Sequence, residues 1–252
     1  MQFLDNVPVQ DFYKTYDESK RLTSDNRHRL ELYRKQYLYK NLLQNSKRVL
    51  QISCGTGVHT KFILDTFPDI ELFASDLVPE HCQETAKLKY KNLRVFQWDC
   101  TQKKPNFIHN IDTILVEGAW YHLDKEQRQY LIANLMSLNP SLIVIDFLSE
   151  LHEVQQRLLQ DKKFINPENG IREPFFFDNR DDAETLAFRI YANNYNVSIC
   201  PIDLDLRFGY IDLNNVPEEE FLKFVDYLNN TIRVSKDFET VNYTEHGCYL
   251  IR

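Results

Sequence analysis

Short apolar segments alternate with amphipathic segments from residue 47 to residue 148, and this alternation constrains the fold more than any other feature. The apolar segments are RVLQIS, IELFAS, LRVFQW, IDTILVEG and SLIVIDFL. They are nearly continuous in apolar residues, which is typical of parallel strands buried on both faces. The intervening sequence predicts helices over 58–67, 79–90 and 124–138. We therefore expect a doubly wound α/β sheet with right-handed crossovers.

The remaining sequence predicts further elements of the same domain. A helical period over 26–44 precedes the first strand, and turn-rich and aromatic sequence (INPENGIRE, PFFFDN) follows the fifth. Helices over 181–194 and 217–230 and two more strands, YNVSICPI and HGCYLIR, complete the pattern. A length of 252 residues suits one large domain. We divide it into a helical cap (1–45), a first half (46–148), an insertion or lid (149–180) and a C-terminal half (181–252).

Composition and charge exclude several classes of partner. A net charge of −7 argues against a broad phosphate-binding surface, so we expect no nucleic-acid partner. The start MQFLDNVPVQ lacks the features of a signal peptide, and no apolar run reaches the ~20 residues of a membrane span. Five cysteines without a C-x-x-C pair predict reduced thiols, a cytoplasmic location and no metal site.

Small or acidic residues follow four successive predicted strands. The sequence Ser53-Cys54-Gly55-Thr56-Gly57 follows the first strand, Asp76 the second, Asp99 the third and Glu117-Gly118 the fourth. In a doubly wound sheet the ligand binds beyond the carboxyl ends of the strands, near the point where the strand order reverses. These residues therefore predict a ligand site at one edge of the sheet.

The loop after the first strand does not suit a phosphate-bearing ligand. A dinucleotide loop requires a glycine three residues after Gly57, where this chain has Thr60. No lysine or arginine lies in the loop, and no G-K-[ST] sequence occurs in the chain. A nucleoside without phosphates is the remaining option.

On these residues the chain resembles the class I S-adenosylmethionine-dependent methyltransferases over roughly residues 45–150. VLQISCGTG resembles their glycine-rich first motif, FASDL their second strand and VFQWDCT the segment after it. The resemblance implies a Rossmann-like, mostly parallel seven-stranded sheet with an antiparallel last strand, and S-adenosylmethionine as cofactor. It assigns Asp76 to the ribose hydroxyls and Asp99 to the adenine amine, although Asp99 in a loop is equally consistent with a helix cap. The predicted cofactor-binding residues are Gln51, Ser53, Cys54, Gly55, Gly57, Asp76, Leu77, Asp99, Cys100, Glu117 and Gly118.

A narrower resemblance concerns the ends of the chain. FYKTYDESKRL, EGAWYHL and TEHGCYLIR are similar to segments of bacterial small-molecule-type methyltransferases with an N-terminal helical cap. It implies a substrate pocket that contains Tyr13, Arg21, Trp120 and Tyr121. His122 is a candidate general base, with a structural helix-entry role as the alternative, and the same two interpretations apply to His246. Tyr13 and Arg21 either close over the cofactor or pack on the sheet edge.

Two positions depart from the pattern of the family. Gln51 stands where members carry an acid that orients the methionine amino group, which weakens that contact by about 1 kcal/mol. Ser53 stands where a glycine is usual, and a positive φ there costs about 1–2 kcal/mol. Both changes concern how tightly the amino-acid end of a cofactor is held.

The sequence predicts an enzyme that transfers a methyl group from S-adenosylmethionine to a small-molecule acceptor. Methyl transfer from a sulfonium requires an aligned, desolvated nucleophile, so the absence of a catalytic triad is expected. E-G-A-W follows the fourth strand in place of an N-P-P-Y motif, which also favours a small molecule over nucleic acid. A non-catalytic cofactor-binding or partner-binding protein on the same fold is the alternative, and an enzyme that uses the cofactor otherwise is a third. The identity of the acceptor and the oligomeric state stay open.

Overall fold

The computed structural model describes Gln10, Tyr13, Lys14, Lys20 and residues 26–149, 176–202, 216–244 and 246–252. Arg21, most of residues 1–25 of the cap and most of the insertion over 149–180 lie outside these residues.

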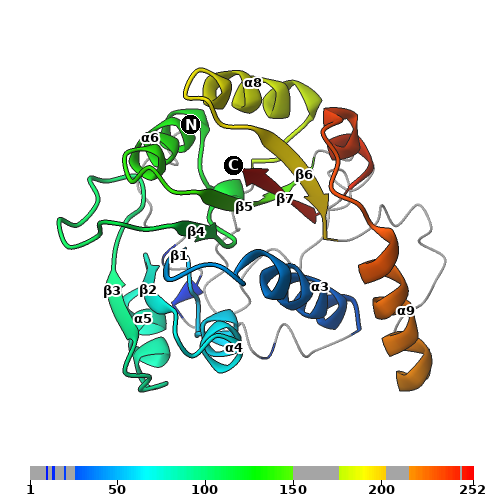
Figure 1. Cartoon of the computed structure of the whole chain (residues 1–252), viewed down its shortest axis with the longest axis horizontal. Helices are drawn as coiled ribbons and strands as arrows, with labels where there is room; N and C mark the ends of the chain where they lie inside the picture. Colours follow the sequence, from blue (N-terminus) through cyan, green and yellow to red (C-terminus); the bar gives the residue numbers. More distant parts are fainter. Residues whose placement is uncertain are drawn as a thin grey trace.

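The described residues form a seven-stranded sheet with the strand order β3-β2-β1-β4-β5-β7-β6 (Figure 1). The neighbouring pairs from β3 to β5 are parallel, whereas β7 is antiparallel to both β5 and β6. This arrangement confirms the prediction of a mostly parallel, doubly wound sheet with an antiparallel last strand. The strands are β1 (Arg48–Ile52), β2 (Glu71–Asp76), β3 (Leu93–Gln97), β4 (Thr113–Val116), β5 (Leu142–Leu148), β6 (Val197–Pro201) and β7 (His246–Ile251).

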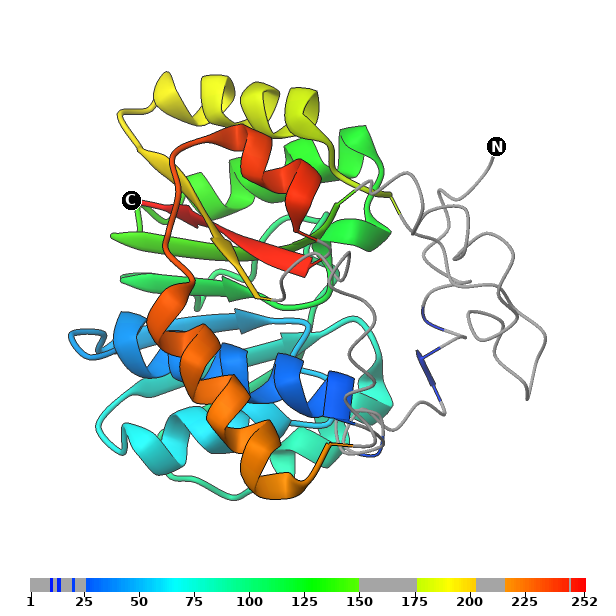
Figure 2. The same cartoon turned by 90° about the vertical axis from the view of Figure 1, so that its right-hand side faces the viewer.

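Helices cover both faces of the sheet (Figure 2). Buried residues of α6 and α8 share one core cluster with one face, and residues of α3 and α4 share a second cluster with the other face. Alternate strand residues such as Leu50 and Val49 divide between these clusters, because successive side chains point to opposite faces. The helices are α3 (Asn26–Leu42), α4 (Val58–Thr66), α5 (Pro79–Ala86), α6 (Lys125–Met136), α8 (Arg180–Tyr191) and α9 (Glu218–Thr231), with 3-10 turns η1 (Trp120–His122) and η5 (Phe238–Tyr243).

Several helix ends differ from the sequence predictions by a few residues, and the 3-10 turns η1 and η5 were not predicted. The helix expected over 79–90 ends at Ala86, and the chain passes through Lys89 with a φ of 56° before β3. The turn η5 was not predicted, because its sequence has neither helical nor strand periodicity. It packs against α8 and β6 and covers that edge of the sheet.

The strand order reverses between β1 and β4. β1 pairs with β2 on one side and with β4 on the other, and all three strands run in the same direction. The loop after β1 and the turn after β4 therefore leave the sheet side by side, at the point where doubly wound sheets bind ligands.

Candidate functional site

The loop after β1 requires positive φ angles at three positions. Ser53 has a φ of 62°, Gly55 of 54° and Gly57 of 88°. A Cβ at Gly57 would lie 2.9 Å from Oγ1 of Thr85, and that hydroxyl donates a hydrogen bond of 2.9 Å to the Gly55 carbonyl. The glycines thus let the loop lie directly against α5.

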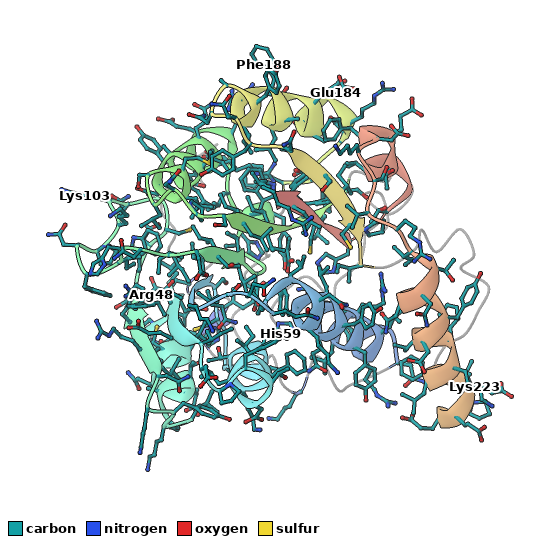
Figure 3. The ribbon with its side chains drawn as sticks, viewed as in Figure 1. Arg48, His59, Lys103, Glu184, Phe188 and Lys223 are labelled. Carbon is teal, nitrogen blue, oxygen red and sulfur yellow. The ribbon has the colours of Figure 1, made fainter. Side chains whose placement is uncertain are left out.

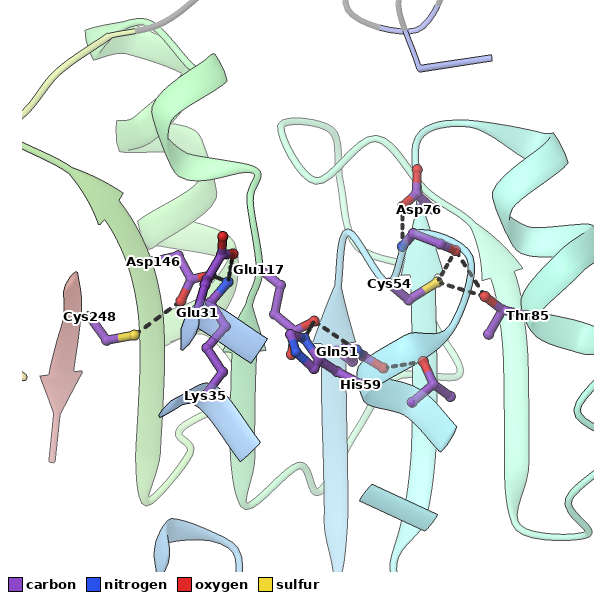
Figure 4. A network of polar contacts seen from close by, with 12 residues as sticks. Glu31, Lys35, Gln51, Cys54, His59, Asp76, Thr85, Glu117, Asp146 and Cys248 are labelled. Carbon is purple, nitrogen blue, oxygen red and sulfur yellow. Dashed lines mark hydrogen bonds and ion pairs between the residues drawn. The ribbon is translucent and has the colours of Figure 1, made fainter. Parts of the chain in front are cut away.

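Asp76, the last residue of β2, is bound to this loop (Figure 4). Its Oδ2 accepts a hydrogen bond of 2.8 Å from the Gly55 amide, and its Oδ1 accepts one of 2.9 Å from the Val78 amide. His81 Nδ1 lies 3.5 Å from Oδ1. The structure therefore brings together the glycine loop and the acid that the sequence assigned to one site. The predicted contact of Asp76 with a ribose stays a prediction.

The predicted cysteines of the site are buried thiols. Burial, and next the nearby charge of Asp76, raise the pKa of Cys54 well above its usual value. Burial is also the first cause that raises the pKa of Cys100 to about 12, with the charge of Asp99 second. Such thiols are not nucleophiles at neutral pH, and their predicted contact with a cofactor stays a prediction. Leu77, also predicted here, is half-buried, and its carbonyl accepts from Gln97 Nε2.

Asp99 follows β3 and is half-buried. Its Oδ1 accepts hydrogen bonds from the amide and the hydroxyl of Thr101, at 2.9 and 2.7 Å. These are the contacts of a local turn, and no helix follows Asp99 before β4, so the side chain does not form the helix cap that was the alternative. Its contact with an adenine amine stays a prediction.

Gln51 belongs to a buried polar network between β1, β4 and α4. Its side-chain amide donates to Glu117 Oε2 at 2.9 Å, and its Oε1 accepts from the Thr60 hydroxyl at 2.7 Å. His59 Nδ1 lies 3.2 Å from the same Glu117 oxygen. Figure 3 shows His59 in the interior of the molecule, whereas Phe188 and Lys223 project from its periphery. Gln51 is therefore held in one orientation beside a carboxylate.

A second buried cluster lies beside this network, where α3 crosses β5 and β7. Lys35 forms an ion pair with Asp146 at 2.5 Å and a second with Glu31 at 3.3 Å. His246 Nε2 lies 3.8 Å from Asp146, and the Cys248 thiol donates to Asp146 at 3.0 Å (Figure 4). Burial would lower the pKa of Lys35, but the charges of Asp146 and Glu31 outweigh it and raise that pKa well above its usual value.

Six residues of these two groups were not predicted from the sequence: Glu31, Lys35, His59, Thr60, Asp146 and Cys248. One signal was available, because Asp146 interrupts the otherwise apolar strand LIVIDFL. An acid in a strand buried on both faces needs a partner. The partner of Asp146 is Lys35 of α3, and no sequence pattern indicated that this helix would cover β5.

Tyr13 connects the ends of two strands at the carboxyl edge. Its hydroxyl lies 3.0 Å from His122 Nε2, in η1 after β4. Its ring makes edge contacts with His122 at 5.5 Å and with His81, near Asp76, at 6.3 Å between centroids. Tyr121 stacks edge-on against His122 at 4.7 Å. The structure thus places Tyr13, Tyr121 and His122 together, as the predicted pocket requires.

Trp120 is placed differently from the other predicted pocket residues. It is 4% exposed, belongs to the hydrophobic core and donates from Nε1 to Asp178 Oδ2 at 3.0 Å. Arg128 lies over its ring at 4.7 Å. These contacts explain the burial of Trp120 without a substrate, because an indole N–H usually has an acceptor when it is buried.

Comparison with known proteins establishes the class of fold. No family model matches the chain, and no curated protein matches its sequence. Among solved structures, the DhpI–SAH complex has a TM-score of 0.58 at 11% identity and covers 98% of this chain and 97% of its own. The plantazolicin methyltransferase BpumL in complex with SAH has a TM-score of 0.56 at 16% identity, with coverages of 100% and 91%. The methyltransferase domain of bacterial CtHen1 has a TM-score of 0.56 at 15% identity, with coverages of 88% and 98%. The chain has the Rossmann-like fold of the class I S-adenosylmethionine-dependent methyltransferases.

The positive φ of Ser53 makes Ser53→Gly a stabilising change. A left-handed conformation is strained for serine and unstrained for glycine, so we expect the free energy of unfolding to rise by about 1 kcal/mol. Urea unfolding of the two proteins measures the difference. Ser137→Gly is the matched control, because Ser137 has a φ of −63° and should lose stability. An unchanged or lower stability of Ser53→Gly would contradict the strain.

Proposed function

We propose that this protein is an S-adenosylmethionine-dependent methyltransferase that acts on a small-molecule acceptor. The observation that supports it best is the contact between Asp76 and the Gly55 amide. This contact holds an acid from β2 against a glycine loop from β1, at the point where the strand order reverses. The loop contains no cationic side chain, so it suits a nucleoside and not a nucleotide phosphate.

The residues at this edge fit the proposed cofactor. Asp76 would accept hydrogen bonds from the ribose hydroxyls and Asp99 would accept one from the adenine amine, while Gly57 keeps the loop close against α5. The cofactor itself supplies an electrophilic methyl group on a sulfonium. The protein then has to align an acceptor, exclude water and receive a proton where the acceptor bears one.

Tyr13, Tyr121 and His122 are the proposed residues of the acceptor side. The His122 ring is buried, and its Nε2 faces the Tyr13 hydroxyl at 3.0 Å. We propose His122 as the group that receives a proton, and Arg21 as a further pocket residue although it lies outside the described residues. The net charge of −7 favours a small acceptor over nucleic acid.

The division of the chain into a cap, two halves and an insertion within one domain is part of this proposal. So is a cytoplasmic location, which is consistent with five cysteines that are all buried and free. No described helix has the length and apolar character that crossing a membrane requires.

Titration calorimetry with S-adenosylmethionine and S-adenosylhomocysteine tests the proposal. The wild-type chain should bind both, and Asp76→Asn should weaken binding by about 10-fold, because one charge-assisted acceptor contributes about 1.5–3 kcal/mol. Asp69→Asn is the matched control, since Asp69 is exposed at the opposite edge of the sheet. Thermal melts of both variants separate lost binding from lost folding.

Two outcomes would contradict parts of the proposal. No binding of either compound by the wild-type chain would refute the cofactor and with it the enzyme. Equal affinities of Asp76→Asn and wild type would refute the ribose contact alone. Binding without turnover on a panel of small acceptors would favour the non-catalytic alternative.

A further inference from the structure

Glu117 is a buried carboxylate that its surroundings do not neutralise. The residue is 6% exposed and directly follows β4. Its Oε2 accepts from the Gln51 amide at 2.9 Å and lies 3.2 Å from His59 Nδ1. A glutamine and an imidazole both donate to a carboxylate as neutral groups, so these contacts orient the charge without requiring a cation.

The second oxygen of Glu117 is unsatisfied. Oε1 is buried and has no hydrogen-bond partner among the described residues, and the same holds for the hydroxyl of Tyr39. Burial, and next the charge of Glu117, raise the pKa of Tyr39 well above its usual value. The carboxylate and the phenol are therefore neighbours. The phenol can donate to Glu117 but is neutral, so the buried carboxylate still lacks a counter-charge, which points to a cation that binds there.

Lys35, a lysine whose pKa the charge of Glu117 helps to raise, is already shared with other carboxylates. The negative charges of Asp146, Glu31 and Glu117 all raise the pKa of Lys35, in that order of size after the opposing effect of burial. Direct ion pairs join Lys35 only to Asp146 and Glu31 within the described part of the chain. One lysine thus faces three carboxylates, and Glu117 is the one that it does not contact.

The position of Glu117 relative to Gln51 identifies the kind of cation. Gln51 is the second-last residue of β1, two residues before Ser53 of the loop that Asp76 holds, and its neutral amide is bound to the Glu117 carboxylate. A ligand that fills this loop brings its far end toward the gap between β1 and β4. The group that such an end can offer to a carboxylate is an ammonium.

We propose that Glu117 is the counter-charge for the ammonium group at the amino-acid end of an S-adenosyl ligand. Gln51 positions the carboxylate through its side-chain amide, and His59 fixes the same oxygen from α4. The protein thereby has its acid on β4 and a neutral amide on β1. This inference rests on the proposed function, because it assumes that the loop binds the S-adenosyl group.

The test compares two ligands that differ at the amino-acid end. S-adenosylhomocysteine has the ammonium, whereas 5′-methylthioadenosine has the same nucleoside and thioether without it. For Glu117→Gln we expect the dissociation constant of S-adenosylhomocysteine to rise about 10-fold and that of methylthioadenosine to change less than about two-fold. Glu126→Gln is the matched control, because Glu126 is exposed at the start of α6.

A charge exchange keeps the test independent of folding defects. The double variant Gln51→Glu/Glu117→Gln moves the carboxylate to β1 and leaves an amide donor on β4. It should recover most of the affinity for S-adenosylhomocysteine that Glu117→Gln loses. If Glu117 only supports the packing of α4, the double variant should not recover this affinity, because it still lacks the Glu117 carboxylate next to His59.

The possible failures are distinguishable. A wild-type chain that binds neither compound refutes the proposed function. Binding of both compounds by Glu117→Gln with wild-type affinities overturns the role of Glu117 and leaves the proposed function in place. Equal losses for both compounds also overturn it, because the effect would then not depend on the ammonium.

Discussion

Lys35→Met is expected to lower the free energy of unfolding by about 3–5 kcal/mol, one of the two largest effects that the structure predicts. The lysine and Asp146 are 6% and 1% exposed, and their ion pair is 2.5 Å long. Methionine fills the volume of the lysine stem but leaves the carboxylate of Asp146 buried without its main counter-charge. Urea unfolding at neutral pH measures the loss.

The pH dependence of this loss identifies its cause. Burial opposes ionisation of Asp146, but Lys35 and then His246 outweigh it, so the pKa lies well below its usual value. A lowered folded-state pKa means that the carboxylate stabilises the fold above its unfolded pKa of about 4, and that this contribution disappears as the pH falls further. In Lys35→Met the carboxyl group can take up a proton at mild acidity. The difference between the two proteins should therefore shrink as the pH falls from 7 toward about 4.

Matched variants separate the ion pair from other effects of the substitution. Lys40→Met, on the exposed side of the same helix, should change stability by less than about 0.5 kcal/mol. Lys35→Met/Asp146→Asn should recover part of the loss, because neither charge is then left alone. A loss for Lys35→Met that is small, or equally large at pH 7 and pH 4, would show that the pair does not stabilise α3 on the sheet.

The sequence was sufficient to predict the sheet because its strands have strong local signals. Continuous apolar segments such as RVLQIS and SLIVIDFL coincide with β1 and β5, and turn signals separate them. Helix ends were harder to predict, because α5 ends at Ala86 with no glycine or proline to mark the place. The turn η5 depends on contacts with α8 and β6, which local sequence does not encode.

The candidate site was predictable where it depends on strand ends and not where it depends on packing between layers. Asp76 and the glycine loop follow strands, so topology alone brings them together. The partners of Gln51 depend on how α4 lies over β1 and β4, and the pattern of the sequence contains no such information. Gln51 alone suggested a weakened contact, whereas the structure shows it bound to Glu117.

Trp120 is the clearest example of a residue whose side-chain contacts cannot be inferred from its position in the sequence. It follows β4 next to Tyr121 and His122, and this proximity suggested a common pocket. The 3-10 turn η1 directs its indole into the core, where Asp178 accepts its N–H. Asp178 is more than fifty residues away in the sequence, so only the folded chain identifies the pair.

Asp178→Ala is the second change with a large expected effect, a loss of about 3–5 kcal/mol in the free energy of unfolding. The carboxylate is 1% exposed, and its Oδ2 accepts from Trp120 Nε1 at 3.0 Å and from the Tyr249 hydroxyl at 2.7 Å. Its Oδ1 forms an ion pair with Arg128 Nη1 at 2.7 Å. Alanine leaves these two donors without this acceptor and removes the counter-charge of Arg128, whose side chain is only 12% exposed. Urea unfolding of the variant measures the loss.

Asp178→Asn should lose clearly less than Asp178→Ala. Burial is the largest influence on Asp178 and raises its pKa even though Arg128 opposes the shift, so the charge is costly to bury. Asparagine keeps an acceptor oxygen for at least one of the two donors, Trp120 and Tyr249, and carries no charge. Asp181→Ala is the control, because Asp181 is exposed in the first turn of α8.

A double-mutant cycle shows whether Arg128 and Asp178 act together. Arg128→Met also breaks the ion pair, so the combined variant Arg128→Met/Asp178→Ala should lose at least about 1 kcal/mol less than the sum of the single losses. The Phe176 amide, two residues before Asp178, donates to the Tyr121 carbonyl of η1 at 2.7 Å. Loss of the Arg128–Asp178 ion pair should therefore also loosen η1. Faster amide exchange in η1, next to Tyr13 and His122, would link this core network to the proposed acceptor side. Additive losses with unchanged exchange in η1 would show that the network stabilises the core alone.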